Sequence, residues 1–320
     1  MRLLLFSFWF LVALSNYNAQ VNFTNDKSGK NANPEELNLF KFANVRDFAM
    51  NKWGTEIYFS VQSAGSEISA IVWSRKKKNK WSEPEVLSFS GKFNDLEPFL
   101  SSDNTRLYFV SNRPLSKTGT QTKDFDIWYC ERNPAGFWSE PKNCGAPINS
   151  SENEFYPSIA KNGNLYFTND GKRSKGKDDI FVCVFKDGKY GSPVSVSDSI
   201  NTEGYEFNAF VGPDEDYIIF TGYNKPDGLG SGDLYISYHK KDGTWSQAKN
   251  MSETFNSKFM DYCPFVDENT KTLYFTSKRN NTSAEFEKNL STEELLDAIN
   301  VYANGQSRLY KVSLGDWLKK

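Results

Sequence analysis

Four carboxylates occupy one recurring position in the sequence, three residues before a proline or alanine in a short apolar segment. They are Asp95, Glu154, Glu206 and Asp261, and Arg46 stands at the same distance before Ala49. A carboxylate ring interrupted by one arginine could bind a cation, an amine or a sugar, and the arginine could pair with a carboxylate. The alternative is that each acid caps a turn by accepting backbone N–H bonds. Repetition in successive copies favours this structural role.

Two further cations depart from the repeat. Arg113 and Arg279 follow the second apolar segment of their copies, and the other copies carry no arginine at that place. Residues that break a repeat are better candidates for a specific role than residues that recur in every copy. The candidate binding residues are therefore Arg46, Asp95, Glu154, Glu206, Asp261, Arg113 and Arg279.

The sequence supplies little for catalysis or for a cofactor. Its single histidine, His239, argues against a histidine base or a histidine-rich metal site. It has no Gly-x-Ser-x-Gly elbow and no phosphate-binding loop. Glycosidases use two carboxylates with different roles, whereas the acids here recur by repeat. We therefore expect no catalytic residue, metal or cofactor, with a carbohydrate-active hydrolase using these carboxylates as the alternative.

Short apolar segments that recur in pairs position these residues. One segment reads Leu107-Tyr-Phe-Val-Ser, and its counterparts are Ile57-Tyr-Phe-Ser, Leu165-Tyr-Phe-Thr, Ile218-Ile-Phe-Thr and Leu273-Tyr-Phe-Thr-Ser. An upstream segment such as Pro98-Phe-Leu and a polar turn such as Ser102-Asp-Asn-Thr complete a hairpin. The aromatic content of 16% also favours strands.

A second hairpin follows in each copy. Its first strand is typified by Asp126-Ile-Trp-Tyr and its last by Trp138-Ser-Glu-Pro. Because proline cannot donate a backbone hydrogen bond, this last strand should lie at the outer edge. Four antiparallel strands that recur about every fifty residues are typical of a β-propeller blade.

Five copies start near residues 46, 95, 154, 206 and 261. The fifth ends without room for an outer strand, and the segment Glu36-Leu-Asn-Leu-Phe-Lys-Phe stands unassigned before the first. We expect this segment to supply the missing strand, since closing the ring removes an open sheet edge. A large apolar residue lies six positions before each start, at Phe40, Phe89, Ile148, Ile200 and Phe255. The prediction is an all-β, five-bladed propeller over residues 36–320; a sixth blade in residues 20–45 would be too short.

The second copy resembles the PD40 repeat family, WD40-like propellers of the TolB type found in many bacterial envelope proteins. The matching residues are Glu97-Pro98, Ser102-Asp103, Leu107-Tyr108-Phe109, Ser111 with Arg113, and Asp126-Ile127-Trp128. Asn104 replaces the family's usual glycine, and the first copy lacks the acidic and Asp-Ile-Tyr features. The resemblance covers residues 46–313. It implies a propeller, often with protein or envelope binding, and no particular catalysis.

The order of the strands determines which loops share a face. Tight turns join strands 1–2 and 3–4 on one face, whereas loops between strands 2 and 3 and the connectors between blades lie on the other. The second face carries long, dissimilar loops at 114–124, 169–178, 222–232 and 278–307. Because variable loops on a rigid framework often carry binding residues, we expect function on this long-loop face.

The longest of these loops should contain a helix. Ser291-Thr-Glu-Glu is a capping box, and Leu295, Leu296, Ile299 and Tyr302 follow at helical spacing. The helix could be a lid or docking element over the channel mouth. The alternative is an insertion whose apolar stripe packs on the last blade, which is the usual meaning of such a stripe.

The N-terminus has the composition of a secretory signal peptide, with Arg2 before an apolar run at residues 3–14. Cleavage after Ala19 is our first choice and cleavage after Ser15 the competitor, so residues 20–35 would form a linker. We expect a periplasmic or secreted monomer without a membrane span, with an envelope protein or a glycan as partner. The net charge of −2 argues against a nucleic-acid partner. The four cysteines could form disulfides, but burial as small apolar side chains is the simpler interpretation.

Overall fold

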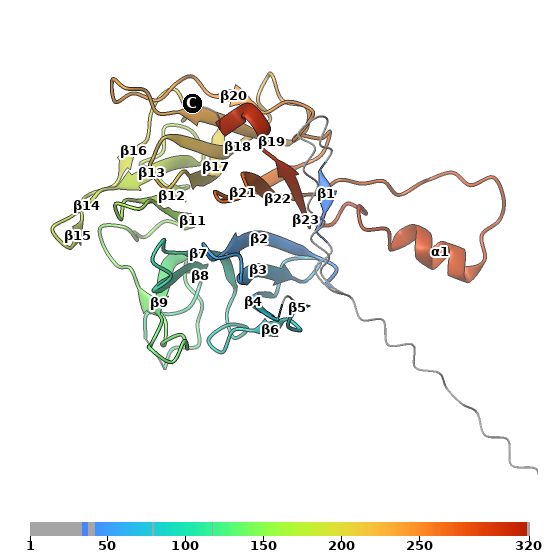
Figure 1. Ribbon diagram of the computed structural model, residues 1–320, viewed down its shortest axis with the longest axis horizontal. Coiled ribbons are helices and arrows are strands. Elements are labelled where there is room, and N and C mark those ends of the chain that lie inside the picture. Colours follow the sequence, from blue (N-terminus) through green and yellow to red (C-terminus); the bar gives the residue numbers. More distant parts are fainter. Residues whose placement is uncertain (1–33, 38–41, 79, 117, 319–320) are drawn as a thin grey trace, which may run out of the picture.

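The computed structural model describes residues 34–37, 42–78, 80–116 and 118–318. Within them, five antiparallel sheets surround a central axis (Figure 1). The five-bladed β-propeller is therefore confirmed. The expected signal peptide at residues 1–19 lies outside the described residues, as do residues 20–33 of the expected linker. No described helix is long and apolar enough to cross a membrane.

Each blade runs outward from an innermost strand at the axis. Blade 1 consists of β2 (Val45–Met50), β3 (Glu56–Gln62), β4 (Ser69–Lys77) and an outer edge split into β5 (Lys80–Trp81) and β6 (Glu85–Val86). Blade 2 consists of β7 (Asp95–Leu100), β8 (Arg106–Ser111), β9 (Asp126–Glu131) and β10 (Lys142–Asn143).

The remaining blades follow the same order. Blade 3 consists of β11 (Glu154–Ile159), β12 (Leu165–Asn169), β13 (Asp179–Cys183) and β16 (Val194–Ser195), with a side hairpin of β14 (Phe185–Lys186) and β15 (Lys189–Tyr190). Blade 4 consists of β17 (Tyr205–Val211), β18 (Tyr217–Tyr223), β19 (Gly232–Tyr238) and β20 (Lys249–Asn250). Blade 5 consists of β21 (Asp261–Asp267), β22 (Thr272–Ser277), β23 (Arg308–Ser313) and β1 (Glu35–Glu36).

The strand β1 closes the ring at the start of the expected segment, whose residues 38–41 lie outside the described residues. It pairs antiparallel with β23, through Glu35 opposite Lys311 and Glu36 opposite Tyr310. The next residue, Leu37, donates its backbone N–H to Leu309 at 2.9 Å and is almost fully buried. An N-terminal strand therefore covers the edge that the last blade would otherwise expose.

The second strands form the core between blades. The phenylalanine of the recurring triplet has no exposed surface in any blade: Phe59, Phe109, Phe167, Phe220 and Phe275. The outer strands are short, and β6, β10 and β16 begin directly after Pro84, Pro141 and Pro193. An outer edge suits proline, because proline has no backbone N–H to donate to a neighbouring strand. In the described part of the chain all four cysteines are free thiols.

The predicted helix is present as α1 (Thr292–Ile299), with the capping box of Ser291 and Glu294 formed in both directions. Its packing differs from both expectations. Leu295, Leu296 and Ile299 are about half exposed, and no residue of the helix is buried. Figure 1 shows the segment projecting outward from the ring, so it neither lies over the channel mouth nor packs on blade 5. We call residues 280–304 the arm.

Candidate functional site

The four recurring carboxylates are buried inside their own blades. None of them has exposed surface. Each accepts hydrogen bonds from the connector that precedes its strand, and in three of the four these come from a serine or threonine backbone N–H and hydroxyl. The hydroxyl contacts are Ser90 to Asp95 at 2.9 Å, Ser150 to Glu154 at 2.5 Å, Thr202 to Glu206 at 2.6 Å and Ser257 to Asp261 at 2.7 Å. This geometry agrees with the alternative that they cap connectors.

Each of these acids also has a cation from the end of the second strand or the loop after it. Arg113 contacts Asp95 at 2.6 Å, and Arg279 contacts Asp261 at 3.3 Å. In blades 3 and 4 the cations come from the loop after the second strand: Arg173 pairs with Glu154, and Lys225 pairs with Glu206. Arg113 and Arg279 therefore differ from the cations of blades 3 and 4 only in their distance along the sequence from the second strand. Both arginines belong to an internal charge pair of their blade.

The sequence alignment of Arg46 with these acids is wrong by one residue. Strand pairing places Arg46 opposite Ser60, which is equivalent to Leu96 opposite Val110 in blade 2. Val45 therefore stands at the position of the acids, and Phe48 is the equivalent of Pro98. Blade 1 has lost its connector carboxylate, and Arg46 belongs to the next layer along the channel.

A ring of five unusual residues lies just beyond Arg46. One equivalent residue near the start of each innermost strand has a left-handed backbone: Asp47 (φ 59°), Glu97 (57°), Tyr156 (51°), Asn208 (51°) and Cys263 (54°). The pairing register of every innermost strand shifts at the same place. Such bulges redirect side chains, and left-handed non-glycine residues often mark functional sites. The backbone geometry recurs in all five blades, but the side chain differs in each.

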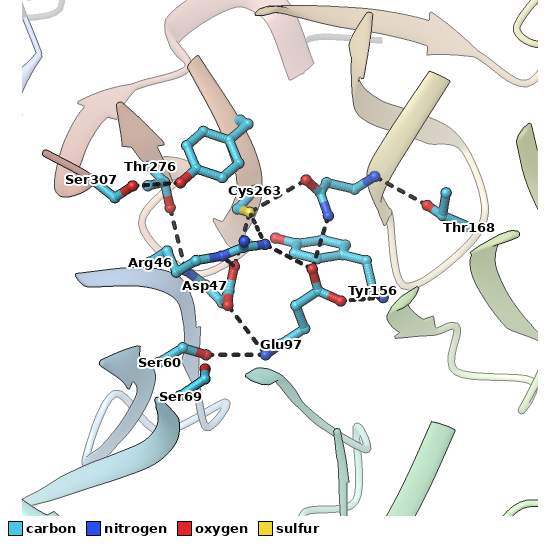
Figure 2. A network of polar contacts seen from close by, with 12 residues as sticks. Arg46, Asp47, Ser60, Ser69, Glu97, Tyr156, Thr168, Cys263, Thr276 and Ser307 are labelled. Carbon is cyan, nitrogen blue, oxygen red and sulfur yellow. Dashed lines mark hydrogen bonds and ion pairs between the residues drawn. The ribbon is translucent and has the colours of Figure 1, made fainter. Parts of the chain in front are cut away.

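Arg46 links this ring across the channel (Figure 2). Its Nε donates to Asp47 at 2.7 Å, and its Nη2 donates to Glu97 at 2.8 Å and contacts the Cys263 sulfur at 3.5 Å. The guanidinium also lies 5.2 Å from the centre of the Tyr262 ring. One cation therefore joins blades 1, 2 and 5 and faces two buried carboxylates.

Further hydrogen bonds complete the network. The Tyr156 hydroxyl donates to the Pro264 carbonyl at 3.0 Å, and the Tyr156 backbone N–H donates to Glu97 at 2.7 Å. Asn208 donates to Glu97 at 3.3 Å, and the Cys263 thiol donates to Asp47 at 2.9 Å. All five blades are thus joined at one level of the channel. We call Arg46 and the five left-handed residues the channel network.

Both Glu97 and Arg46 have raised pKa values in the network, but for different physical reasons and with opposite effects on their charge. Burial raises the pKa of Glu97 to about 7, although the Arg46 guanidinium acts in the other direction. Burial by itself would lower the pKa of Arg46, but the charges beside it, Asp47 first, raise that pKa well above its usual value. Arg46 therefore stays protonated while Glu97 can exchange a proton near neutral pH.

A cavity of about 220 Å³ opens above the network on the long-loop face. Arg46 and Glu97 reach its floor, and its aromatic lining consists of Phe155, Phe207 and Tyr262. Asp178, at the end of a long loop, lies at the cavity as well, and burial raises its pKa to about 6. The cavity combines aromatic faces, one cation and two carboxyl groups in a small volume.

Of the predicted site residues, only Arg46 lines this cavity. Asp95, Glu154, Glu206, Asp261, Arg113 and Arg279 form internal pairs instead. Sequence reasoning missed Glu97, Phe155, Phe207 and Tyr262 as site residues. In the sequence, each of these residues follows the connector acid by one or two positions. The side chain at these positions differs from blade to blade, and this variation could have identified them.

Comparison with known proteins gives the fold. No family model matches the chain, and no curated protein is significantly similar in sequence. A solved glycoside hydrolase superposes with a TM-score of 0.53 at 8% identity, covering 88% of this chain and 90% of that one. TolB from Acinetobacter baumannii gives 0.46 at 14% identity, covering 85% of this chain and 55% of TolB. An endo-arabinanase of glycoside hydrolase family 43 from Bacillus licheniformis gives 0.47 at 17%, covering 85% and 94%.

The superposition with a TM-score above 0.5 concerns the fold alone. This chain spans about half the length of TolB but most of the length of the two glycan-degrading enzymes. The PD40 repeat type itself is matched by no family model. At identities of 17% and below, the function has to be argued from the site.

Proposed function

We propose that this chain is a non-catalytic binding propeller of the bacterial envelope, exported to the periplasm or secreted, that takes one sugar unit of a glycan at the long-loop end of its channel. The observation that carries the proposal is the cavity of about 220 Å³ with Arg46 and Glu97 beside three aromatic rings. At about 30 Å³ per water molecule, it has room for about seven waters, which is the scale of one sugar ring.

The lining fits the two faces of a sugar. The C–H face of a sugar ring packs on aromatic side chains, and Phe155, Phe207 and Tyr262 offer such surfaces. Sugar hydroxyls accept from a guanidinium and donate to carboxylates through charge-assisted bonds, for which Arg46 and Glu97 are placed. A mostly apolar pocket with a few convergent polar groups is the usual form of a small-ligand site.

The state of the two channel carboxylates supports binding over hydrolysis. Asp47 accepts from Arg46 and Cys263 on one oxygen and from the Glu97 backbone N–H on the other, and both oxygens of Glu97 are also engaged. Glycoside hydrolysis needs two carboxylates facing the scissile bond, with space for water or an attack between them. Arg46 occupies the place between Asp47 and Glu97, and Asp47 does not line the cavity.

The hydrolase remains the second candidate because of one observation. Glu97 borders the cavity with a pKa of about 7, a value that suits a general acid. Release of reducing ends from a polysaccharide panel, abolished in Glu97→Gln, would establish this function and overturn the non-catalytic one.

Calorimetric titration with glucose, galactose, N-acetylglucosamine and glucuronate tests the proposal. We expect one of these sugars to bind the wild type, and Phe155→Leu with Phe207→Leu to weaken binding at least tenfold. Leucine keeps the apolar volume while removing the flat faces. Phe137→Leu with Phe185→Leu is the matched control, because both rings are exposed and neither lines the cavity. Equal affinity in the wild type and the double variant, or no binding of any of the four sugars, would contradict the proposal.

A further inference from the structure

A second and larger cavity lies at the opposite end of the channel, on the tight-turn face. Its volume is about 870 Å³, and it is bordered by the turn between strands 1 and 2 in all five blades. Leu318 of η1 (Gly315–Leu318) contributes to its wall. Sequence reasoning assigned no role to this face, because its turns are short and similar. We call this cavity and the five turns around it the funnel.

The floor of the funnel is aromatic. Phe99, Phe210 and Phe265 occupy one equivalent position in blades 2, 4 and 5, two residues after the left-handed ring. Their ring centres are 5.4 to 6.4 Å apart, with interplanar angles of 47° to 72°. All three rings contact one another and line the cavity, so the floor offers ring faces and edges to a bound group. The channel network lies directly behind this floor.

The rim of the funnel is acidic on balance. It contains five carboxylates (Asp103, Asp214, Asp216, Asp267 and Glu268) and three lysines (Lys52, Lys161 and Lys271). Two of the lysines are already paired within the rim, Lys161 with Asp214 at 3.1 Å and Lys271 with Glu268 at 2.6 Å. The third, Lys52, lies 4.9 Å from the centre of the Trp53 ring. The rim therefore keeps an excess of negative charge above an apolar floor.

Local hydrogen bonds hold two of the rim carboxylates in place. Asp103 accepts from the Ser101 hydroxyl at 2.6 Å and from Thr105 at 2.8 and 3.0 Å. These bonds outweigh the effect of burial and lower its pKa. Asp267 accepts from Asn269 and Thr270. A carboxylate that is already held in place loses less conformational entropy when it binds a cation than a mobile one does.

From this arrangement we propose that the funnel binds an organic cation with an aromatic or aliphatic body. The body packs against the three phenylalanines and the ammonium lies among the rim carboxylates. A volume of about 870 Å³ is within the usual range for a small-ligand pocket. The site is separate from the sugar cavity, and its occupancy does not depend on the proposed glycan function.

A set of matched probes tests the charge and body requirements separately. Tryptamine, indole-3-ethanol and indole-3-acetate share one aromatic body and are cationic, neutral and anionic. We expect calorimetry or ligand-observed NMR to show that tryptamine binds at least tenfold more tightly than indole-3-acetate, with the alcohol between them. Equal affinities for the three, or no detectable binding of tryptamine, would overturn the proposal.

Two variants locate the binding. Asp103→Asn with Asp267→Asn should weaken tryptamine binding about fivefold, since each exposed charge contributes modestly. Asp198→Asn is the control, because Asp198 is 86% exposed and pairs with Lys175 outside the funnel. Phe207→Leu changes the sugar cavity only and should leave tryptamine affinity unchanged, so failure of one site is distinguishable from failure of the other. Weaker tryptamine binding in Phe207→Leu but not in the rim variant would place the cation on the wrong face and refute the proposal.

Discussion

Arg46 is a single positive charge shared by two buried carboxylates at the axis of the molecule. Its removal would leave Asp47 and Glu97 close together without a cation, and breaking a buried pair from one side is costly. Methionine keeps much of the volume but none of the charge. We therefore expect Arg46→Met to lower the free energy of unfolding by about 3 kcal/mol.

Urea denaturation at neutral pH measures this effect. Lys175→Met is the control, because its ion pair with Asp198 is exposed and should contribute no more than about 0.5 kcal/mol. If the two variants lost the same small amount of stability, the channel network would have no structural role.

Glu97 should give the stability a distinctive dependence on pH. Burial raises its pKa in the folded protein to about 7, above the 4.5 that is usual for a glutamate. The folded state then holds a proton that the unfolded chain has released, so stability falls as pH rises between these values, by at most about 1.4 kcal/mol per unit. Glu97→Gln removes this titration.

The difference in stability between wild type and Glu97→Gln should therefore be most favourable to the wild type at about pH 5 and shrink by about pH 8. Thermal unfolding across this range checks it. Glu154 and Asp178 also have raised pKa values, so both proteins keep part of the same slope. Parallel curves for the two proteins would contradict the raised pKa of Glu97.

The residues of the channel network could not be found from the sequence because their pattern lies in the backbone. Asp47, Glu97, Tyr156, Asn208 and Cys263 share a left-handed conformation but no side-chain type. By contrast, the acids that do recur are connector caps. The one-residue error at Arg46 arose because Phe48 replaces the proline that marks three of the other four copies.

At the scale of elements, the strands were predictable because each copy repeats an apolar triplet between polar turns. The innermost strands begin at residues 45, 95, 154, 205 and 261. Closure by β1 followed from the missing outer strand of blade 5. The packing of the arm could not be predicted, because an amphipathic helix has the same sequence whether its stripe is covered or exposed.

The arm should be dispensable for the fold. It is anchored at its neck, where the Tyr302 hydroxyl contacts the carbonyls of Leu37 and Leu309 at 2.8 and 2.7 Å. Replacing residues 284–300 by a short glycine–serine linker keeps this neck. We expect the melting temperature to change by less than about 2 °C, because no residue of α1 is buried.

Tyr302→Ala is the matched comparison, since it removes the anchor while leaving the helix. It should lower the free energy of unfolding by at least about 1 kcal/mol. A larger loss from the loop replacement than from Tyr302→Ala would show that the helix packs on the propeller in solution.

At the scale of the whole molecule, the channel network divides the axis into two chambers of different chemistry. The long-loop side is small, aromatic and charged, and the tight-turn side is larger with an apolar floor and an acidic rim. Hydrogen bonds across the axis join all five blades between them. This ring of left-handed residues therefore joins the blades, and two of its members, Glu97 and Asn208, also line the candidate binding site.

Saturation-transfer NMR with the methyl glycoside of the sugar selected by titration tests the central claim most directly. We expect the strongest saturation on the C–H protons of one sugar face, transferred from Phe155, Phe207 and Tyr262, and its loss in the Phe155→Leu, Phe207→Leu double variant. The sugar should be recovered unchanged at the end of the measurement. Undiminished saturation in the double variant would contradict sugar binding at these rings. Hydrolysis of the glycoside by the wild type, and not by Glu97→Gln, would contradict a non-catalytic function.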